Sequence, residues 1–263
     1  MSTKRYNKVL SFVVIAAVAV LSVINTNAAS AKNPKVLVFG LSAAFAHTSI
    51  PAGMAAIQKL GKENNFDCVL TFDADDFNDA NLKQFAAVIF VSTTGDFFKT
   101  DAQKDALKKF IQKGGGYVGI HAATDAMKQW QWYGDLSGGY FKQHPMGTPV
   151  ETIDVVDKTS NATKFLPARW ERKDEWYAFT YQPKDVHVLL NLDESSAPAG
   201  TYDGRSAGAS MGKDHPLAWW HDFDGGRAFY TALGHTEASF QEPLFLQHLE
   251  AGIEYAMGRK KMQ

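Results

Sequence analysis

Four short apolar segments in the first half of the chain alternate with helical patterns, and this alternation most constrains the fold. Each segment is followed by glycine or small polar residues, as is typical of a buried strand. The segments are residues 35–39, 68–72, 87–91 and 116–120. Apolar residues recur at helical spacing after Thr48 or Ser49 and after Thr100, so we expect helices to begin there. Alternating strands and helices predict a parallel sheet with helices on both faces.

The second half of the chain reads as mostly strands, which we expect to extend one edge of that sheet. The predicted strands are residues 150–156, 176–181, 186–191, 217–223 and 227–233, and a closing helix covers 242–257. Asp224-Gly225 is a hairpin signal between the last two strands. Residues 195–212 are rich in Ser, Ala and Gly and predict a long loop, which in a compact domain is often functional.

The first 31 residues have the pattern of a cleavable secretory signal. Three cations within residues 4–8 precede the uncharged apolar run 9–24, and Ala29-Ser30-Ala31 fits the A-x-A cleavage pattern. The run is shorter than the roughly 20 apolar residues of a membrane-spanning helix. We therefore expect a Sec-type signal, no stable membrane insertion, and a single mature domain of residues 32–263 that is periplasmic or secreted. An uncleaved anchor is the alternative.

Composition excludes several classes of function. Lysines and arginines number 27 against 28 acidic residues, a formal net charge of −1, so we expect no nucleic-acid partner. Cys68 is the one cysteine, which excludes an internal disulfide, a zinc finger and a CxxC redox site. Eight histidines remain as candidates for chemistry.

His121 is the first candidate, because residues 119–123 (GIHAA) follow the fourth strand directly. Small residues around one central side chain resemble a nucleophile elbow, which exposes that side chain at the end of the sheet. A histidine there suits a general base or a metal ligand. The alternative is a histidine that only ties loop backbone together.

Further polar residues follow other predicted strands, where ligands bind in parallel sheets. His47 follows the first strand and is a candidate catalytic residue. Glu175 is another, because in residues 174–177 (DEWY) the alternation of a strand lets one carboxylate enter a site while its neighbour points away. Thr94 and Asp96 follow the third strand and suit hydrogen bonds to the hydroxyl groups of a polar ligand. For each of these, a local role in the loop is the alternative.

Other histidines lie at loop or strand boundaries and allow a metal site. We expect His121, His215 and His235 as ligands of a divalent transition metal such as Zn, Ni, Mn or Fe, with His144 close to the substrate. No pair has local ligand spacing such as H-E-x-x-H, so distant loops would have to assemble the site.

Aromatic residues accompany several of these polar candidates. We expect Trp132, Trp176 and Tyr177 to line the pocket, because aromatic faces beside polar groups suit a sugar ring. Ordinary core packing is the alternative for each of them.

Six motifs in this order make the chain similar to the ThuA-like, or trehalose-utilization, family. They are AFAHTSIP (44–51), TTGD (93–96), GGGYVGIHAA (114–123), DEWY (174–177), DHP (214–216) and GRAFYTALGHT (226–236). The resemblance runs from about Lys35 to Gly258. It implies a class I glutamine-amidotransferase-like fold, which is an α/β flavodoxin-like three-layer sandwich with a mostly parallel sheet.

The resemblance also bears on activity. True amidotransferases of this fold carry a cysteine at the elbow, and here His121 takes that place, so glutaminase chemistry should be absent. The family is associated with the catabolism of trehalose and related disaccharides. One departure is Ala46, where the family often has arginine before the histidine.

The hypothesis that follows is an exported enzyme acting on a disaccharide, glycoside or keto-sugar. Histidine acid/base or metal-assisted chemistry would drive hydrolysis, elimination or isomerisation. The alternatives are a non-catalytic sugar-binding protein of the same fold and a cell-envelope interaction module. The sequence leaves the substrate, the metal and the oligomeric state open.

Overall fold

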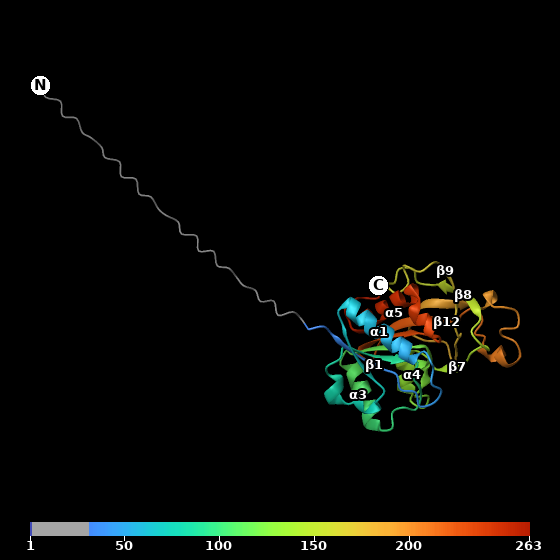
Figure 1. Ribbon diagram of the computed structural model, residues 1–263, viewed down its shortest axis with the longest axis horizontal. Helices are drawn as coiled ribbons and strands as arrows, with labels where there is room; N and C mark the ends of the chain where they lie inside the picture. The colour runs from blue at the N-terminus through green and yellow to red at the C-terminus, as the bar shows by residue number, and fades with distance from the viewer. Residues whose placement is uncertain (2–31) are drawn as a thin grey trace. The chain divides into compact units, whose positions relative to one another are not determined.

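A central nine-stranded sheet organises the part of the chain that the structure describes (Figure 1). The structure is a computed structural model of the 263-residue chain and describes Met1 and residues 32–263. The predicted leader, residues 1–31, lies outside the described residues apart from Met1. No helix of the described residues is long and apolar enough to cross a membrane.

The strands of the large sheet follow the order β2-β1-β3-β5-β13-β12-β11-β8-β9. The first five of these strands are mutually parallel in the order of a flavodoxin-like sheet, and the last four pair antiparallel with their neighbours. The predicted α/β fold, a parallel half extended at one edge, is therefore confirmed. The nine strands are β1 (Lys35–Phe39), β2 (Asp67–Thr71), β3 (Ala87–Val91), β5 (Gly116–Ile120), β8 (Val150–Val155), β9 (Arg169–Lys173), β11 (His187–Asp193), β12 (Pro216–Phe223) and β13 (Gly226–Thr231).

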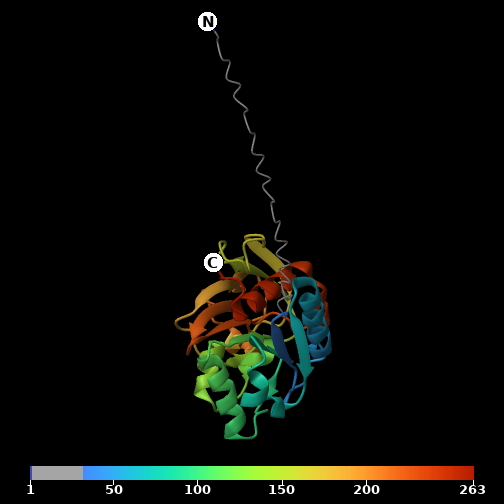
Figure 2. The same cartoon turned by 90° about the vertical axis from the view of Figure 1, so that its left-hand side faces the viewer.

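Helices cover both faces of the parallel half. Helices α1 (Ile50–Asn64) and α5 (Pro243–Ala256) lie on one face, and α3 (Asp101–Gln112) and α4 (Gln131–Ser137) on the other, as Figures 1 and 2 show. A hydrophobic core lies between the sheet and each pair of helices, and alternate residues of β1 point into one core or the other. Val36 and Val38 pack on the side of α1 and α5, and Leu37 and Phe39 on the side of α3 and α4. A short helix, α2 (Asp79–Leu82), precedes β3.

Helix α3 begins after Thr100, as expected, with a capping box: the Thr100 hydroxyl accepts from the backbone N–H of Gln103, and the Gln103 side chain accepts from the backbone N–H of Thr100. Ser49 is the N-cap of α1, but its hydroxyl donates to the carbonyl of Gly234 instead of capping the helix. That bond ties the start of α1 to the loop after β13.

The prediction of a strand over residues 176–181 is wrong. Only β10 (Ala178–Phe179) pairs there, with β7 (Phe141–Gln143) in a separate two-stranded sheet. The large-sheet strand of this region is β9, which lies earlier. The alternation of apolar and polar residues is weak in β9, because one of its two buried positions carries a charged residue, Arg172. Side-chain hydrogen bonds hold residues 174–177 instead.

The carboxyl ends of β3, β5 and β13 lie side by side, since Val91 is paired with Ile120 and Ile120 with Thr231. The loops after these strands, and the loop after the adjacent β1, therefore leave the same edge of the sheet. A third small pairing, of β4 (Thr94–Gly95) with β6 (Asp125–Ala126), joins two of the loops.

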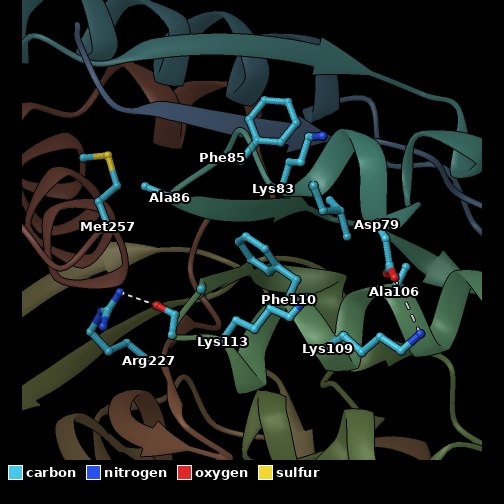
Figure 3. Close-up of a pocket in the computed structure, with 13 residues that line it drawn as sticks. Asp79, Lys83, Phe85, Ala86, Ala106, Lys109, Phe110, Lys113, Arg227 and Met257 are labelled. Atoms are coloured by element: carbon cyan, nitrogen blue, oxygen red, sulfur yellow. Dashed lines mark hydrogen bonds and ion pairs between the residues drawn. The ribbon is translucent and has the colours of Figure 1, made fainter.

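A cavity of about 340 Å³ lies at the other end of these strands, near the residues where they begin (Figure 3). Lys83, Lys109, Lys113 and Arg227 contribute to its wall, with Phe110 among the apolar residues. None of the predicted site residues lines it.

Candidate functional site

His121 is the first residue after β5, where the short 3-10 helix η2 (His121–Thr124) begins. Its φ is +51°, in the left-handed region that residues other than glycine rarely adopt. The hydroxyl of Tyr230 donates to the His121 carbonyl at 2.8 Å and holds this sharp turn. Such strain at the end of a buried strand is common at functional sites.

The His121 ring is fully buried, and one hydrogen bond fixes its orientation. Nδ1 lies 2.8 Å from the carbonyl oxygen of Ala232, which can only accept, so Nδ1 carries the hydrogen. In the neutral ring, Nε2 then presents a lone pair. Nε2 lies 3.1 Å from Nδ1 of His235 and 3.3 Å from Oε2 of Glu175.

Glu175 and His235 complete a triangle with His121. Nδ1 of His235 lies 3.1 Å from Oε2 of Glu175, so each of the three atoms is within 3.3 Å of the other two. The second carboxylate oxygen of Glu175 is 3.4 Å from Nε2 of His144. Both oxygens of this buried carboxylate therefore face imidazoles.

The carboxylate of Asp174 holds two members of the triangle in place. It is fully buried and accepts from the backbone N–H groups of Glu175, Gly234 and His235, at 2.9 to 3.0 Å. Nη2 of Arg172, at the end of β9, lies 3.1 Å from Asp174 Oδ2. Asp174 thus joins the segment after β9 to the loop after β13.

His47 lies against this triangle from the loop after β1. Its ring centroid is 4.8 Å from that of His121 and 5.2 Å from that of His235. Among the described residues its buried Nδ1 has no hydrogen-bond partner. Burial, followed by the charges of His121 and His235, lowers the pKa of His47 to about 3. The ring is therefore neutral at physiological pH and retains a lone pair.

Charge in the cluster is balanced between Glu175 and the histidines. Burial alone raises the pKa of Glu175, but hydrogen bonds from His121 and His235, donated when these rings carry a second proton, outweigh it and hold the pKa well below its usual range. Burial lowers the pKa of His235, and the Glu175 carboxylate outweighs that effect and raises it. The buried carboxylate thus stays ionised and requires positive charge beside it.

The triangle of His121, Glu175 and His235 has the size that a single metal ion requires, and His47 lies beside it as a candidate fourth ligand. One ligand atom from each of His47, His121, Glu175 and His235 lies within 4.8 Å of the others. An ion about 2.1 Å from its ligands, at bond angles of about 90–109°, separates neighbouring ligand atoms by about 3.0–3.4 Å. The triangle has this size, and imidazole with carboxylate is a donor set that suits Zn, Fe, Mn or Ni.

The sequence profile of the ThuA family, described as trehalose utilisation, matches residues 35–256, most of the chain. The chain belongs to the ThuA family. No curated protein matches it.

Solved structures of ThuA-like proteins share the fold. One from Bacteroides uniformis ATCC 8492 has 26% identity and a TM-score of 0.73, over 88% of this chain and 95% of that one. One from Parabacteroides merdae ATCC 43184 has 18% identity and a TM-score of 0.68, over 88% and 92%. A beta-galactosidase from Bacillus circulans sp. alkalophilus has 15% identity and a TM-score of 0.53, over 86% of this chain and 31% of that one, a likeness of fold alone.

Several of the residues predicted from the sequence come together. The cluster unites His47, His121, Glu175 and His235, and His144 touches Glu175 at its border. Tyr177 also lies beside the cluster. Its ring is buried and packs on the ring of His121, with centroids 4.2 Å apart, and so supports the histidine.

Two predicted substrate-binding residues have local roles instead. The Thr94 hydroxyl is buried and donates to the carbonyl of Phe45 at 2.7 Å, which fastens the His47 loop. Asp96 is exposed, and its carbonyl accepts from the ammonium group of Lys99.

The two predicted tryptophans lie away from the cluster. The Trp132 indole donates to Asp224 at 2.8 Å. Asp224 lies in the β12–β13 hairpin, at the end of β13 opposite to the cluster. Trp176 is fully buried, and its indole donates to the carbonyl of Pro149 at 3.0 Å. Both are packing residues, which corrects our expectation that they line the site.

His215 does not join the cluster as the predicted metal ligand. Its Nδ1 lies 2.7 Å from Oε1 of Glu194 and its Nε2 2.9 Å from the carbonyl oxygen of Tyr177, so both nitrogens are engaged. Glu194 also accepts from the backbone N–H groups of Met211 and Gly212. His215 therefore links the ends of the long loop, predicted at 195–212, to the segment that carries Glu175.

Sequence reasoning missed Asp174, and also Phe45, whose ring packs edge to face on that of His47 with centroids 4.9 Å apart. Asp174 stands beside Glu175 in the DEWY motif, so the sequence did point to this pair. Which of the two carboxylates enters the site depends on the backbone conformation of residues 174–177, which form neither helix nor strand. Phe45 stands two residues before His47, and nothing in the sequence distinguishes it from a core phenylalanine.

We predict that Asp174→Asn destabilises the fold by about 3–5 kcal/mol. The amide places a donor among the backbone N–H groups and leaves the buried Arg172 with only Glu242, a partly exposed carboxylate, as its anion. Urea unfolding measures the loss, with Asp203→Asn as the control because Asp203 is exposed and makes no capping bond. Equal unfolding midpoints for the two variants would contradict the role assigned to Asp174.

A second prediction concerns Glu151 on β8, whose carboxylate accepts from the Tyr202 hydroxyl at 2.9 Å beneath the long loop. Burial, despite this hydrogen bond, raises the pKa of Glu151 from 4.5 to about 7. The folded state then binds more protons than the unfolded state between these values, so this carboxyl costs stability as the pH rises from 4.5 to 7.

We expect Glu151→Gln to remove that cost. The stability of the variant relative to the wild type should rise between pH 4.5 and pH 8 by on the order of 2 kcal/mol. Urea unfolding across this range measures it, with Glu171→Gln, exposed on β9, as the control. If the stability of the wild type and that of Glu151→Gln change equally with pH, the pKa of Glu151 is not raised in the folded state.

Proposed function

We propose that this ThuA-family protein is a divalent-metal-dependent enzyme that acts on a carbohydrate, with the ion held by His47, His121, Glu175 and His235. The observation that carries the proposal is the triangle of donor atoms 3.1–3.3 Å apart. Ala232 fixes the hydrogen of the neutral His121 ring on Nδ1, so in that form Nε2 turns its lone pair toward a carboxylate oxygen. A cation between them removes that repulsion.

The carbohydrate part of the proposal rests on the family, which is described as trehalose utilisation. A glycoside or an oxidised keto-sugar is the substrate class we favour. When bound, a divalent ion supplies Lewis acidity toward a sugar carbonyl or hydroxyl oxygen. Hydrolysis, elimination and isomerisation all draw on that effect.

His144 is the residue we assign to proton transfer. It is partly exposed, its Nδ1 donates to the Pro145 carbonyl at 2.8 Å, and its Nε2 faces Glu175 at 3.4 Å. A histidine so placed can hold a proton beside the cluster and pass it to a substrate on the solvent side. Tyr177 stacks parallel to the His144 ring, with centroids 6.0 Å apart, and limits its movement.

Glutamine amidotransfer is disfavoured by the same geometry. His121 occupies the elbow where such chemistry needs a thiol. Cys68 lies in the edge strand β2, and burial raises the pKa of its thiol to about 11, so it is not a thiolate at physiological pH.

We further propose that the protein is exported and works in the periplasm or outside the cell. The basic start, apolar run and A-x-A site of residues 1–31 support this. Amino-terminal sequencing of the protein from its native cells should find a chain that begins near Lys32.

Metal content tests the first part of the proposal. We expect one ion per chain after incubation with Zn, Mn, Ni or Fe(II) and desalting, and loss of that ion in His121→Ala and His235→Ala. His187→Ala is the matched control, because His187 is exposed on β11 and stacks on Trp220. A wild-type protein that retains none of these ions would overturn the metal assignment.

Activity of the loaded protein tests the second part. On a panel of trehalose-type disaccharides and keto-glycosides, we expect His144→Ala to keep its ion and lose more than about 100-fold in kcat. Unchanged kcat would remove His144 from the chemistry. Sugar binding without any turnover by the wild type would favour the non-catalytic alternative.

A further inference from the structure

The cavity of about 340 Å³ lies far from the metal-binding cluster, at the end of the sheet where β3, β5 and β13 begin (Figure 3). Gly115 lines it and directly precedes β5, whereas His121 of the cluster directly follows β5. No residue of the cluster lines the cavity. Its volume is at the lower end of the range of small-molecule sites, about 300–1,000 Å³. It has room for a small ligand of its own.

Positive charge is concentrated around this cavity. Four cationic side chains line it, against one acidic side chain, that of Asp79. Lys109 is paired with Asp79, with Nζ 3.6 Å from Oδ2. The ammonium groups of Lys83 and Lys113 have no ion-pair or hydrogen-bond partner among the described residues. The excess is local, because the whole chain has 27 basic and 28 acidic residues. An anion in the cavity would offset the repulsion between these cations.

Arg227 is the cation whose position is fixed. Its Nε donates to the carbonyls of Tyr255 and Ala256 at the end of α5, both at 3.1 Å. Its Nη2 donates to the carbonyl of Gly114 at 2.7 Å, the bond drawn beside the cavity in Figure 3. Within the described part of the chain, Nη1 has no partner. A guanidinium held in this way loses little conformational freedom when it binds a carboxylate.

The dipoles of nearby helices do not account for all four cations. Lys109 and Lys113 lie at the C-terminal end of α3, where positive charge stabilises the negative end of the helix dipole. Lys83 follows α2, which has a single turn and therefore a small dipole. Arg227 belongs to a strand. A ligand gives a common reason for the four to meet.

Buried apolar side chains form much of the remaining wall of the cavity. They are Leu82, Phe85, Ala106, Phe110 and Met257. Figure 3 shows Phe85 beside Lys83 in its upper part, and Phe110 with Lys109 in its lower part. A ligand that fills the space must therefore combine an apolar body with a negative charge.

The backbone around the cavity favours a carboxylate over a phosphate. Phosphate sites present several free backbone N–H groups, often those of a helix N-terminus. Here the N–H groups of Phe85, Gly114 and Gly115 are already donated to carbonyls of the protein. The last turn of α3 also brings the negative end of its dipole, which opposes a doubly charged group.

We infer that this cavity is a second binding site, for a small organic acid in which one carboxylate is joined to an apolar, preferably aromatic, body. The carboxylate meets the guanidinium of Arg227 and the ammonium groups of Lys83 and Lys113. The apolar body lies against Phe85 and Phe110. The site is independent of the proposed metal-dependent function, because it uses the other end of the sheet.

Titration of the full chain with phenylacetate and 2-naphthoate, followed by NMR, tests the inference. We expect both acids to bind. Phenylacetamide, which has the same shape as phenylacetate but no charge, should bind at least about 10-fold more weakly. Acetate, which lacks the apolar body, should also bind at least about 10-fold more weakly. Added salt should weaken the binding of both acids.

Two lysine variants locate the site. Lys83→Gln and Lys113→Gln should each weaken the binding of phenylacetate by about 3-fold, because each removes one cation from the cavity. Neither lysine has a partner among the residues described, so both variants should fold. Lys158→Gln is the matched control, since Lys158 is exposed and lies outside the cavity. It makes the same change in net charge and should leave the affinity unchanged.

Metal removal separates this site from the cluster. The affinity for phenylacetate should be equal before and after treatment of the protein with a chelator. Loss of binding on metal removal would place the acid at the ion of the cluster and overturn the inference.

Other results would also overturn it. They are equal affinities for phenylacetate and phenylacetamide, equal affinities of the wild type and both lysine variants, and absence of binding of both acids at about 10 mM. Tighter binding of phenyl phosphate than of phenylacetate would contradict the choice of a carboxylate. Each of these results leaves the proposed function of the cluster standing.

Discussion

The buried carboxylate of Asp174 is the interaction on which the site depends. It accepts three backbone N–H groups from two segments that are 59 or more residues apart in the chain, those of Glu175 and of Gly234 with His235. One segment follows β9 at the far antiparallel edge of the sheet, and the other follows β13 in the parallel half. Without this anchor, the carboxylate of Glu175 has no fixed position relative to the histidines.

A second constraint is charge balance in a nearly dry site. Glu175 stays ionised although burial opposes it, because imidazoles face both of its oxygens. His47 adds a neutral ring with an unpartnered nitrogen. Such a cluster is unfavourable as packing alone, since apolar residues of similar volume would cost less to bury. A bound cation is the simplest reason for four such groups to converge at the carboxyl ends of parallel strands.

This ThuA-family chain has a common α/β sheet, but it carries a histidine at the elbow after β5. The turn after β5 has the left-handed backbone of an elbow, yet it presents an imidazole whose one nitrogen is committed to Ala232. A nucleophile must be free to attack, whereas a ligand must be held. The hydrogen bond to Ala232 holds His121 and leaves its other nitrogen directed at the cluster, which suits ligation.

The sequence alone determined the parallel half of the sheet, the elbow at His121 and the family, because these depend on local period and short motifs. It also brought His47 and His235 forward as candidates from their places at strand ends, and Glu175 from the paired carboxylates and aromatics of residues 174–177. Only the tertiary structure decided that His215 serves the long loop, that Trp132 and Trp176 pack elsewhere, and that Asp174 anchors while Glu175 enters. The physical reason is that these roles depend on which distant backbone carbonyl or N–H group a side chain meets, and one-dimensional spacing carries no information about that partner.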